Sequence, residues 1–238
     1  MRKIIRQGFP LVVLCGMWIG TSVAAEELSL PKEAQEMLVK ASQVKSYRVR
    51  FALEAKEEDG KPVRMEGVLL YAQPNRRRLE LKTPESEESS QLVVSDGTTE
   101  WQYYSGTHTA YRLESSPMAP GPHRAFAEMQ EGTVRFIEKR SEGDTALLRF
   151  EATPLSAVVE GSPVPIETLQ VDVREADGLV QRLVLLGQKG DTVLMQQYQD
   201  LELNPSVSEE TFHFTPPEGT QVVEMGARLN GDKKGEKI

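Results

Sequence analysis

Apolar and polar residues alternate along most of this chain, in short segments that end at turn residues. Near the start, Tyr47, Val49 and Phe51 alternate with charged or polar residues, and residues 169–173 repeat the pattern. A period of two places alternate side chains on opposite faces of a β-strand, so each segment predicts a strand with one buried face. The predicted strands cover residues 47–56, 63–73, 77–82, 91–95, 100–104, 107–113, 133–140, 146–152, 165–174, 179–187 and 192–203.

Helical spacing of apolar residues is found in only two places. From Pro31 to Val44 apolar residues recur every three or four positions, and proline suits the first turn of a helix. Pro122 to Glu131 also predicts a short helix, which would present Phe126 and Met129. We therefore expect a mainly β (α+β) fold, in which a large, curved antiparallel sheet packs helices on its concave face.

The first 25 residues have the pattern of a secretory signal peptide. Basic residues at positions 2, 3 and 6 precede an apolar run over residues 9–20, and small residues stand at positions 23 and 25. The run is shorter than the roughly 20 apolar residues that span a bilayer. We expect export, with cleavage after Ala25.

Cys15 is the one cysteine of the chain and lies inside this leader. Leu14 precedes it, where lipidation of a cysteine requires a small residue, so we expect Cys15 to be discarded rather than lipidated. The mature chain then has no disulfide and must be held together by burial of apolar side chains. Its length predicts one domain over residues 26–225, followed by a flexible tail over residues 226–238.

Charge excludes one class of partner. The whole chain has a net charge of −8, and without the leader 25 basic residues face 36 acidic ones, a net charge of −11. Nucleic-acid binding needs clustered Lys and Arg to neutralise phosphates, so we expect no nucleic-acid partner.

Catalytic and metal-binding motifs are missing from the sequence. It has no Gly-x-Ser-x-Gly elbow, no phosphate-binding loop and no His-Glu-x-x-His pair, and His108, His123 and His213 share no metal-ligand spacing. The acidic run at residues 85–88 lacks the regular spacing of a calcium loop and predicts a solvated loop. We expect a binding protein with no enzymatic activity, no cofactor and no metal.

Two stretches carry motifs that are more specific. Residues 67–104 hold GVLLY, Pro74, the RLE of residues 78–80, the LVVSDG of residues 92–97 and then Trp101 and Tyr103. Residues 198–201 (YQDL) lead through residues 204–205 (NP) to FHFTPPEG at residues 212–219. In order and spacing these resemble the LolA-type periplasmic carriers of outer-membrane lipoproteins, over most of the mature chain except residues 115–166.

The resemblance implies a half-open β-barrel whose apolar concave face, lidded by short helices, holds the acyl chains of a lipoprotein or lipid. It implies a periplasmic monomer that receives cargo from an inner-membrane release complex and passes it to an outer-membrane acceptor. An acyl chain of sixteen carbons carries on the order of 12 kcal/mol of hydrophobic transfer free energy, so the carrier must offer a comparable apolar lining.

Candidates for this lining come from both kinds of predicted element. The predicted strands supply Leu69, Tyr71, Leu79, Leu81, Trp101 and Tyr103, and the predicted helices supply Met37, Leu38, Phe126 and Met129. Each of these residues is equally compatible with ordinary core packing.

One position departs from the family pattern. In the family, an arginine directly before the strand-ending proline hydrogen-bonds the lid closed, whereas this chain has Gln73 before Pro74. A neutral amide lacks the charged fork of arginine, so we expect a weaker latch at Gln73.

Two other functions remain open from the sequence. The first is a regulatory protein on the same scaffold, which senses a lipid and reports envelope stress to a protein partner. Such a regulator is expected to carry a further partner-binding domain, and only about 13 residues follow Met225, which favours the carrier. The second is an envelope hydrolase, which the missing catalytic motifs disfavour.

Overall fold

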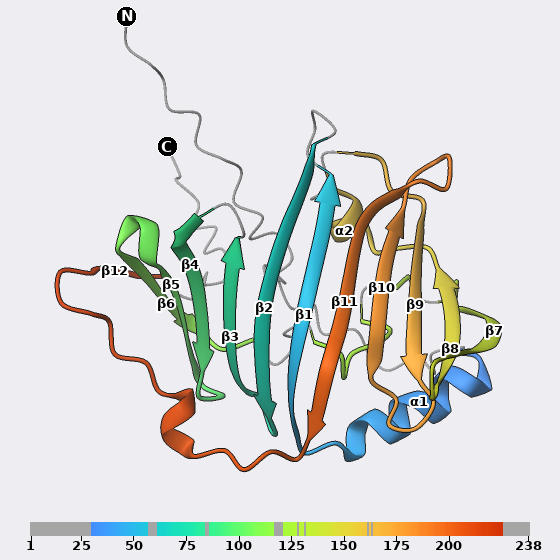
Figure 1. The fold of residues 1–238 in the computed structure, drawn as a ribbon, viewed down its shortest axis with the longest axis horizontal. Helices are drawn as coiled ribbons and strands as arrows, with labels where there is room; N and C mark the ends of the chain where they lie inside the picture. Colours follow the sequence, from blue (N-terminus) through green and yellow to red (C-terminus); the bar gives the residue numbers. More distant parts are fainter. Residues whose placement is uncertain are drawn as a thin grey trace, which may run out of the picture. The chain divides into compact units, whose positions relative to one another are not determined.

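The computed structural model describes residues 30–56, 61–83, 86–116, 121–127, 129–130, 132–160, 162 and 164–225. Its helices include α1 (Lys32–Gln43), α2 (Ser156–Glu160), η2 (Ser105–Thr107) and η3 (Glu209–Phe212). Its strands are β1 (Ser46–Lys56), β2 (Pro62–Ala72), β3 (Arg76–Thr83), β4 (Ser86–Ser95), β5 (Thr99–Tyr104), β6 (Thr109–Glu114), β7 (Arg135–Glu142), β8 (Thr145–Ala152), β9 (Thr168–Arg174), β10 (Val180–Leu186), β11 (Thr192–Leu203) and β12 (Gln221–Glu224) (Figure 1).

These strands belong to one sheet, in the order β12-β6-β5-β4-β3-β2-β1-β11-β10-β9-β8-β7. β12 and β7 end the order, so the sheet does not close on itself. The predicted mainly β fold is therefore confirmed. One pair departs from the antiparallel expectation, because β12 pairs with β6 in parallel, with Gln221 opposite Thr109 and Glu224 opposite Arg112.

Most predicted elements occur close to their predicted bounds. The helical pattern before Val44 forms α1, and the pattern over residues 192–203 forms β11. Helix α2 and strand β12 were not predicted, and the solvated loop predicted for the acidic run at residues 85–88 is wrong from Ser86 onward, because β4 begins there. The leader, Cys15 and the tail lie outside the described residues.

The helix predicted over residues 122–131 is wrong in the part that is described. Arg124, Ala127 and Met129 each donate a backbone N–H to the carbonyl three residues earlier, which makes successive turns. Met129 then forms an isolated β-bridge with Pro154. A segment of this length is too short to be helical on its own, so contacts with other elements decide its conformation.

The described chain divides into two compact units, each built from three separate segments. Unit 1 takes the described residues of 1–44, 53–63 and 118–198, and unit 2 takes those of 45–52, 64–117 and 199–238. That the mature chain is one domain stays a prediction.

In unit 1 the apolar faces of β8 and β9 form a sealed core. Phe150 lies opposite Val171, and Leu148 lies opposite Val173. Phe150, Val171 and Val173 are completely buried. The ring of Phe136, from β7, lies 5.7 Å from that of Phe150.

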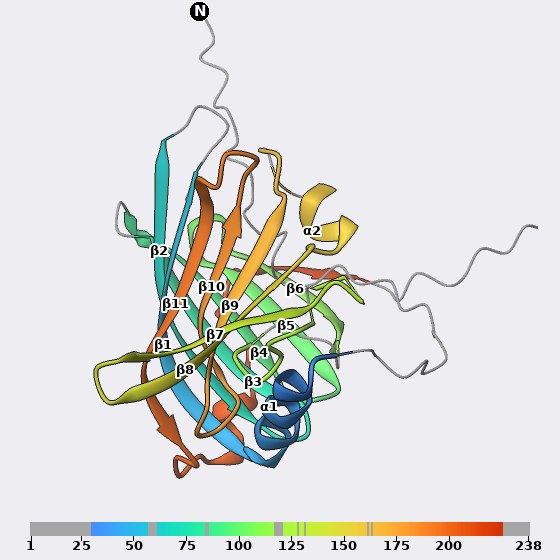
Figure 2. The same ribbon diagram turned by 90° about the vertical axis from the view of Figure 1, so that its right-hand side faces the viewer.

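Helix α1 packs on the turn between β9 and β10. Its buried residues Ala34, Met37 and Ala41 follow helical spacing. In that turn Gly178 has a φ of +73°, and a Cβ there would clash with the Met37 carbonyl and lie 2.8 Å from the Ala41 nitrogen. Glycine is thus required by the close approach as well as by the backbone conformation. Figures 1 and 2 show α1 and α2 at opposite ends of the strands of unit 1.

In unit 2 a stacked tyrosine pair and one glycine shape the start of the sheet. The rings of Tyr47 and Tyr71 stack with centroids 5.1 Å apart. A Cβ on Gly67 would lie 2.8 Å from the ring of Phe51, so the absence of a side chain at Gly67 makes room for this ring on β2.

Candidate functional site

The strand register of unit 2 places four of the predicted lining residues on one face. Leu69 lies opposite Leu79, and Leu79 lies opposite Val93 on the next strand. Residues directly opposite in a ladder share a face, as do residues two apart along a strand, so Tyr71 and Leu81 lie there as well. We call this set, Leu69, Tyr71, Leu79, Leu81 and Val93, the leucine–tyrosine face.

This face is apolar and not uniformly buried. Leu69, Tyr71, Leu81 and Val93 are buried, whereas Leu79 at its centre is only half-buried. Tyr47 stacks on Tyr71, so it extends the face toward β1.

Trp101 and Tyr103 lie on the opposite face, so the six predicted strand residues do not form one lining. Trp101 lies opposite Val94, and Tyr103 lies opposite Leu92, each one residue out of phase with Val93. On this second face the ring of Phe214 lies 5.8 Å from Trp101 and 5.6 Å from Tyr103. The sequence of β5 already indicated this separation, because Glu100 and Gln102 alternate with Trp101 and Tyr103 and so lie on the other face.

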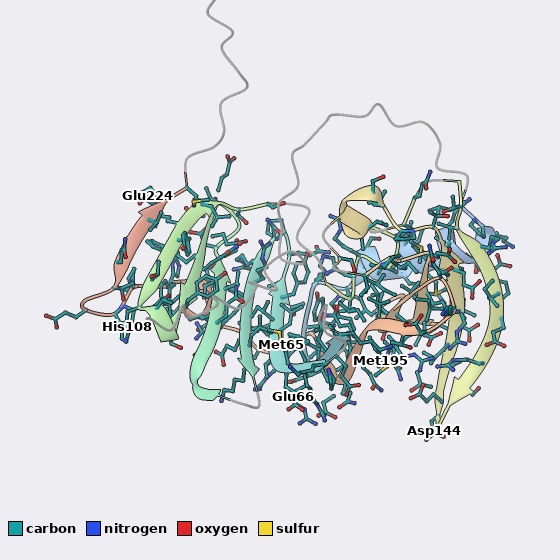
Figure 3. The ribbon with its side chains drawn as sticks, turned by 90° about the horizontal axis from the view of Figure 1, so that it is seen from above. Met65, Glu66, His108, Asp144, Met195 and Glu224 are labelled. Carbon is teal, nitrogen blue, oxygen red and sulfur yellow. The ribbon has the colours of Figure 1, made fainter. Side chains whose placement is uncertain are left out.

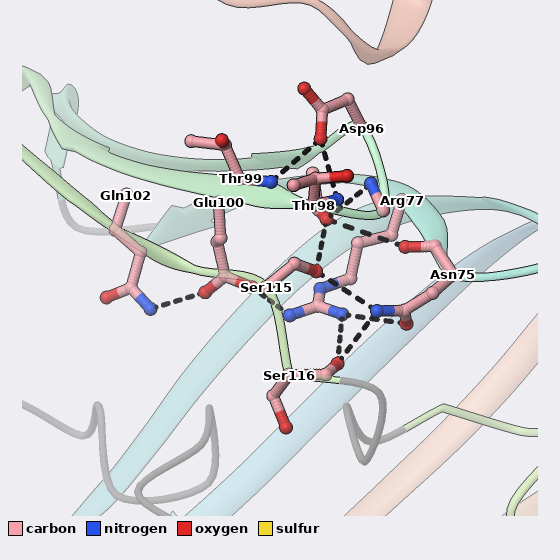
Figure 4. Close-up of polar contacts among 11 residues, drawn as sticks. Asn75, Arg77, Asp96, Thr98, Thr99, Glu100, Gln102, Ser115 and Ser116 are labelled. Atoms are coloured by element: carbon pink, nitrogen blue, oxygen red, sulfur yellow. Dashed lines mark hydrogen bonds and ion pairs between the residues drawn. The ribbon is translucent and has the colours of Figure 1, made fainter. Parts of the chain in front are cut away.

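A buried polar cluster ends the leucine–tyrosine face. Arg77, opposite Tyr71 and two residues from Leu79, forms an ion pair with Glu100, and the two side chains are only 11% and 4% exposed. Gln102 Nε2 donates to Glu100 Oε1 at 2.7 Å (Figure 4). Because both charges are paired and hydrogen-bonded, they are accommodated beside an apolar surface.

The same cluster holds the chain where it leaves β6. Asn75 Nδ2 donates to Ser115 Oγ at 3.0 Å and to the Ser116 carbonyl at 3.0 Å. Arg77 Nη1 donates to that carbonyl at 3.3 Å, and the hydroxyls of Ser95 and Ser115 lie 2.6 Å apart. This role was not predicted, although the alternation of Arg76, Arg77 and Arg78 already puts only the middle arginine on the apolar face.

Gln73 lies in the turn between β2 and β3 and is exposed. Its backbone N–H donates to the Lys45 carbonyl at 2.8 Å, and its own carbonyl accepts from Arg76 Nη2 at 3.3 Å. A latch at this position stays a prediction.

The four lining residues predicted on helices all belong to unit 1. Met37 is buried on the Gly178 turn, whereas Leu38 is 37% exposed. The ring of Phe126 meets that of Phe150 edge-on at 5.0 Å, and Met129 is buried. Met37, Phe126 and Met129 thus contribute to packing within unit 1.

The described part of the chain has neither a membrane-spanning helix nor a cluster of metal-binding side chains. None of its helices is both long enough and apolar enough to cross a bilayer. Nor do its described His, Cys, Asp and Glu residues include three grouped so that they could hold a metal ion.

Comparison with known proteins gives a likeness of fold. No protein-family model and no curated protein matches this chain. An uncharacterized conserved protein from Thermus thermophilus superposes with a TM-score of 0.59 at 13% identity, over 82% of this chain and 100% of that one. Its backbone follows the same path as this chain over most of the described residues.

LolA superfamily proteins are among the structural neighbours of this chain. NE2245 of that superfamily, from Nitrosomonas europaea, aligns over 76% of this chain and 97% of its own, at 13% identity and a TM-score of 0.37. A structure of the Pseudomonas aeruginosa MucA/MucB complex aligns over 78% of this chain and 62% of its own, at 15% identity and a TM-score of 0.48. At such identities the likeness concerns the fold alone.

Proposed function

We propose that this protein binds the acyl chains of a lipid or lipoprotein on the leucine–tyrosine face of unit 2 and carries them through the periplasm toward the outer membrane. The proposal rests on one observation above all: Leu69, Tyr71 and Leu79 share a face in which the central leucine is only half-buried. An apolar side chain that packing leaves partly open is available to an apolar ligand.

Three further observations support a carrier. The leader predicts export, the sequence motifs resemble those of lipoprotein carriers, and the fold has LolA superfamily proteins among its neighbours. Reversible burial of an acyl chain requires no covalent step, and the transfer free energy of a sixteen-carbon chain, on the order of 12 kcal/mol, is large enough to hold cargo in water.

The face also has a direction. Leu79 and Leu81 are apolar and lie toward one end, while Arg77 and Glu100 form the buried ion pair at the other end. An acyl chain gains free energy from apolar contacts alone, so we place it along Leu69, Leu79 and Leu81 rather than over the polar cluster.

The test compares two leucines on opposite faces. Leu79 in β3 and Leu92 in β4 are both half-buried, and Leu92 lies opposite Glu80 on the face away from Leu79. With delipidated protein and an environment-sensitive fluorescent fatty acid, Leu79→Asn is expected to weaken binding about tenfold, the loss of roughly 1.4 kcal/mol of apolar contact. Leu92→Asn is expected to bind like the wild type.

Thermal unfolding of both variants provides the control for misfolding. Equal loss of binding in the two leucine variants, or absence of saturable binding by the wild type, would contradict the proposed site. Mass spectrometry of lipids and lipoproteins that co-purify from the periplasm then identifies the cargo, and a protein partner recovered without any lipid would favour the regulatory function instead.

A further inference from the structure

The C-terminal arm, residues 205–225, crosses unit 2 from the end of β11 to β12. Before it, the Asn204 N–H donates to the Ser46 carbonyl at 2.9 Å, and near its end the Gln221 N–H donates to the His108 carbonyl at 2.8 Å. Figure 1 shows the arm passing the lower ends of β2 and β3 on its way to β12.

Between these two ends the backbone of the arm bonds only to itself. Within the described residues, its backbone hydrogen bonds join Thr211 to Ser208, His213 to Glu210 and Thr220 to Pro217. No ladder fixes residues 205–220 to the sheet, so side chains must hold them.

Two aromatic residues, separated by one residue, provide most of that attachment. Phe212 is 2% exposed, and the Arg76 guanidinium lies 5.3 Å from its ring centroid. Phe214 packs on Trp101 and Tyr103. Two of its ion pairs, Arg76 with Glu209 at 3.6 Å and Arg112 with Glu224 at 3.4 Å, involve glutamates that are 88% and 65% exposed, and such surface pairs contribute little.

The strand at the end of the arm is also weakly attached. β12 pairs over four residues and in parallel, an arrangement slightly less stable per residue than antiparallel pairing. Val222 and Met225 are 45% and 46% exposed. Figure 3 shows Glu224 and His108 at this edge of unit 2.

The two ends of the sheet are protected differently. β7, at one end, carries its own charges in Arg135, Glu138, Lys139, Arg140 and Glu142. Charged side chains on an edge strand discourage pairing with another chain. β6 carries fewer, and its edge is covered by β12 instead.

We propose that the C-terminal arm is displaceable, and that the surface beneath it binds an extended segment of another polypeptide with the pattern of the arm itself. That segment has two aromatic residues separated by one residue, followed by a short apolar strand. Trp101 and Tyr103 take its second aromatic ring, and the edge of β6 pairs with its backbone. The arm seated there in the structure defines what the surface accepts, and strand addition combined with aromatic pockets is a recurrent mode of peptide recognition.

A partner segment and the C-terminal arm compete for the same surface. A partner segment binds only the fraction of molecules in which the arm is open, so its apparent affinity is reduced by that fraction. Any change that weakens the arm without altering Trp101 or Tyr103 must therefore raise the affinity. This surface lies on the face opposite Leu79, so the proposal does not depend on lipid binding.

The experiment uses the full-length chain and a labelled synthetic peptide of residues 205–225. Phe214→Ala weakens the arm but leaves its receptor intact, and we expect this variant to bind the peptide about tenfold more tightly than the wild type. Phe136→Ala, which removes another half-buried phenylalanine, in unit 1, is the matched control and should bind like the wild type. Adding Trp101→Ala to Phe214→Ala should remove the gain.

Hydrogen exchange in the wild type measures the opening of the arm without any substitution. The amides of Gln221 and Met225, which donate to His108 and Arg112, should exchange faster than those of β5 and with little dependence on denaturant. Exchange as slow as that of β5, or equal peptide binding by Phe214→Ala and wild type, would overturn the proposal.

Discussion

In unit 1 the carboxylate of Asp172 receives three arginines, whereas in unit 2 the carboxylate of Glu100 pairs with one arginine, Arg77, and accepts a hydrogen bond from Gln102. Arg149, Arg182 and Arg140 approach Asp172 at 2.8, 2.9 and 3.0 Å. They come from β8, β10 and β7 onto β9, so one buried side chain joins four strands. The hydrogen bond to Asp172 raises the pKa of Arg149 above its ordinary value.

The two clusters also differ in the face they occupy. Asp172 lies opposite Arg149, on the face away from Phe150 and Val171, so the ionic groups of unit 1 leave its apolar core intact. Arg77 lies on the same face as Leu79. Unit 1 thus separates its charges from a sealed core, whereas unit 2 combines buried charges with a partly open apolar face, and we place binding in unit 2 for that reason.

The largest effect is expected from the core of unit 1. Phe150 is fully buried between Phe126 and Phe136, so Phe150→Ala should lower the free energy of unfolding by about 4 kcal/mol through lost burial and the cavity left behind. Leu79→Ala, at a half-buried site, should lower the free energy of unfolding clearly less. Urea unfolding measures both, and equal costs would mean that the two units are packed equally tightly.

Loss of the shared carboxylate should come next. Asp172→Asn leaves three arginines without their common partner, and none of their side chains is more than 29% exposed. We expect a loss of about 3 kcal/mol in the free energy of unfolding, with binding of the fatty-acid probe unchanged at a temperature where the variant is folded.

The matched control is Asp144→Asn, at the exposed tip of the β7–β8 hairpin (Figure 3). It should change stability by no more than about 0.5 kcal/mol. If Asp172→Asn abolished probe binding in the folded state, the assignment of binding to unit 2 alone would be wrong.

The contrast between the units also explains which elements and which site residues could be predicted from the sequence. The strands could be predicted because a strand with one buried face needs an apolar residue at every second position, as over residues 169–173. The alternation in β5 shows that Trp101 and Gln102 lie on different faces, but which of the two faces continues that of Leu79 depends on the register across β4 and β5. The helix predicted over residues 122–131 failed because Phe126 and Met129 bind separate partners, Phe150 and Pro154, that lie far away in sequence.

The turn between β4 and β5 gives a smaller, pH-dependent effect. Burial tends to raise the pKa of the Asp96 carboxyl, but N–H groups of Thr99 and Thr98 and the charge of His213 together hold it below its ordinary value. A depressed pKa in the folded state stabilises the protein above the pKa of the unfolded chain, and this contribution disappears as pH falls through the folded value. The stability advantage of wild type over Asp96→Asn should therefore be constant near neutral pH and vanish in acid.

Urea unfolding of wild type and Asp96→Asn between pH 7 and pH 2 measures this difference. Glu218, which is exposed, supplies a control carboxylate through Glu218→Gln. A difference between wild type and Asp96→Asn that grew as pH fell would contradict the sign of the shift.

The smallest effect should come from Gln73, where the carriers that the sequence resembles have arginine. In this chain the exit from β6 is held by Asn75 and Arg77, both of which donate to the Ser116 carbonyl, while Gln73 is exposed in the preceding turn. Gln73→Ala should therefore change stability by no more than about 0.5 kcal/mol and leave the off-rate of the fatty-acid probe nearly unaltered. Asn75→Ala removes a side chain that bonds both Ser115 and Ser116, so it should alter stability and off-rate more.

Gln73→Arg adds a second guanidinium group near that of Arg77. We expect it to slow release of the fatty-acid probe, because charge-assisted hydrogen bonds are about twice as strong as neutral ones. A large loss of probe binding in Gln73→Ala at unchanged stability would show instead that the side-chain amide of Gln73 contacts cargo. Cargo binding would then not be confined to the leucine–tyrosine face.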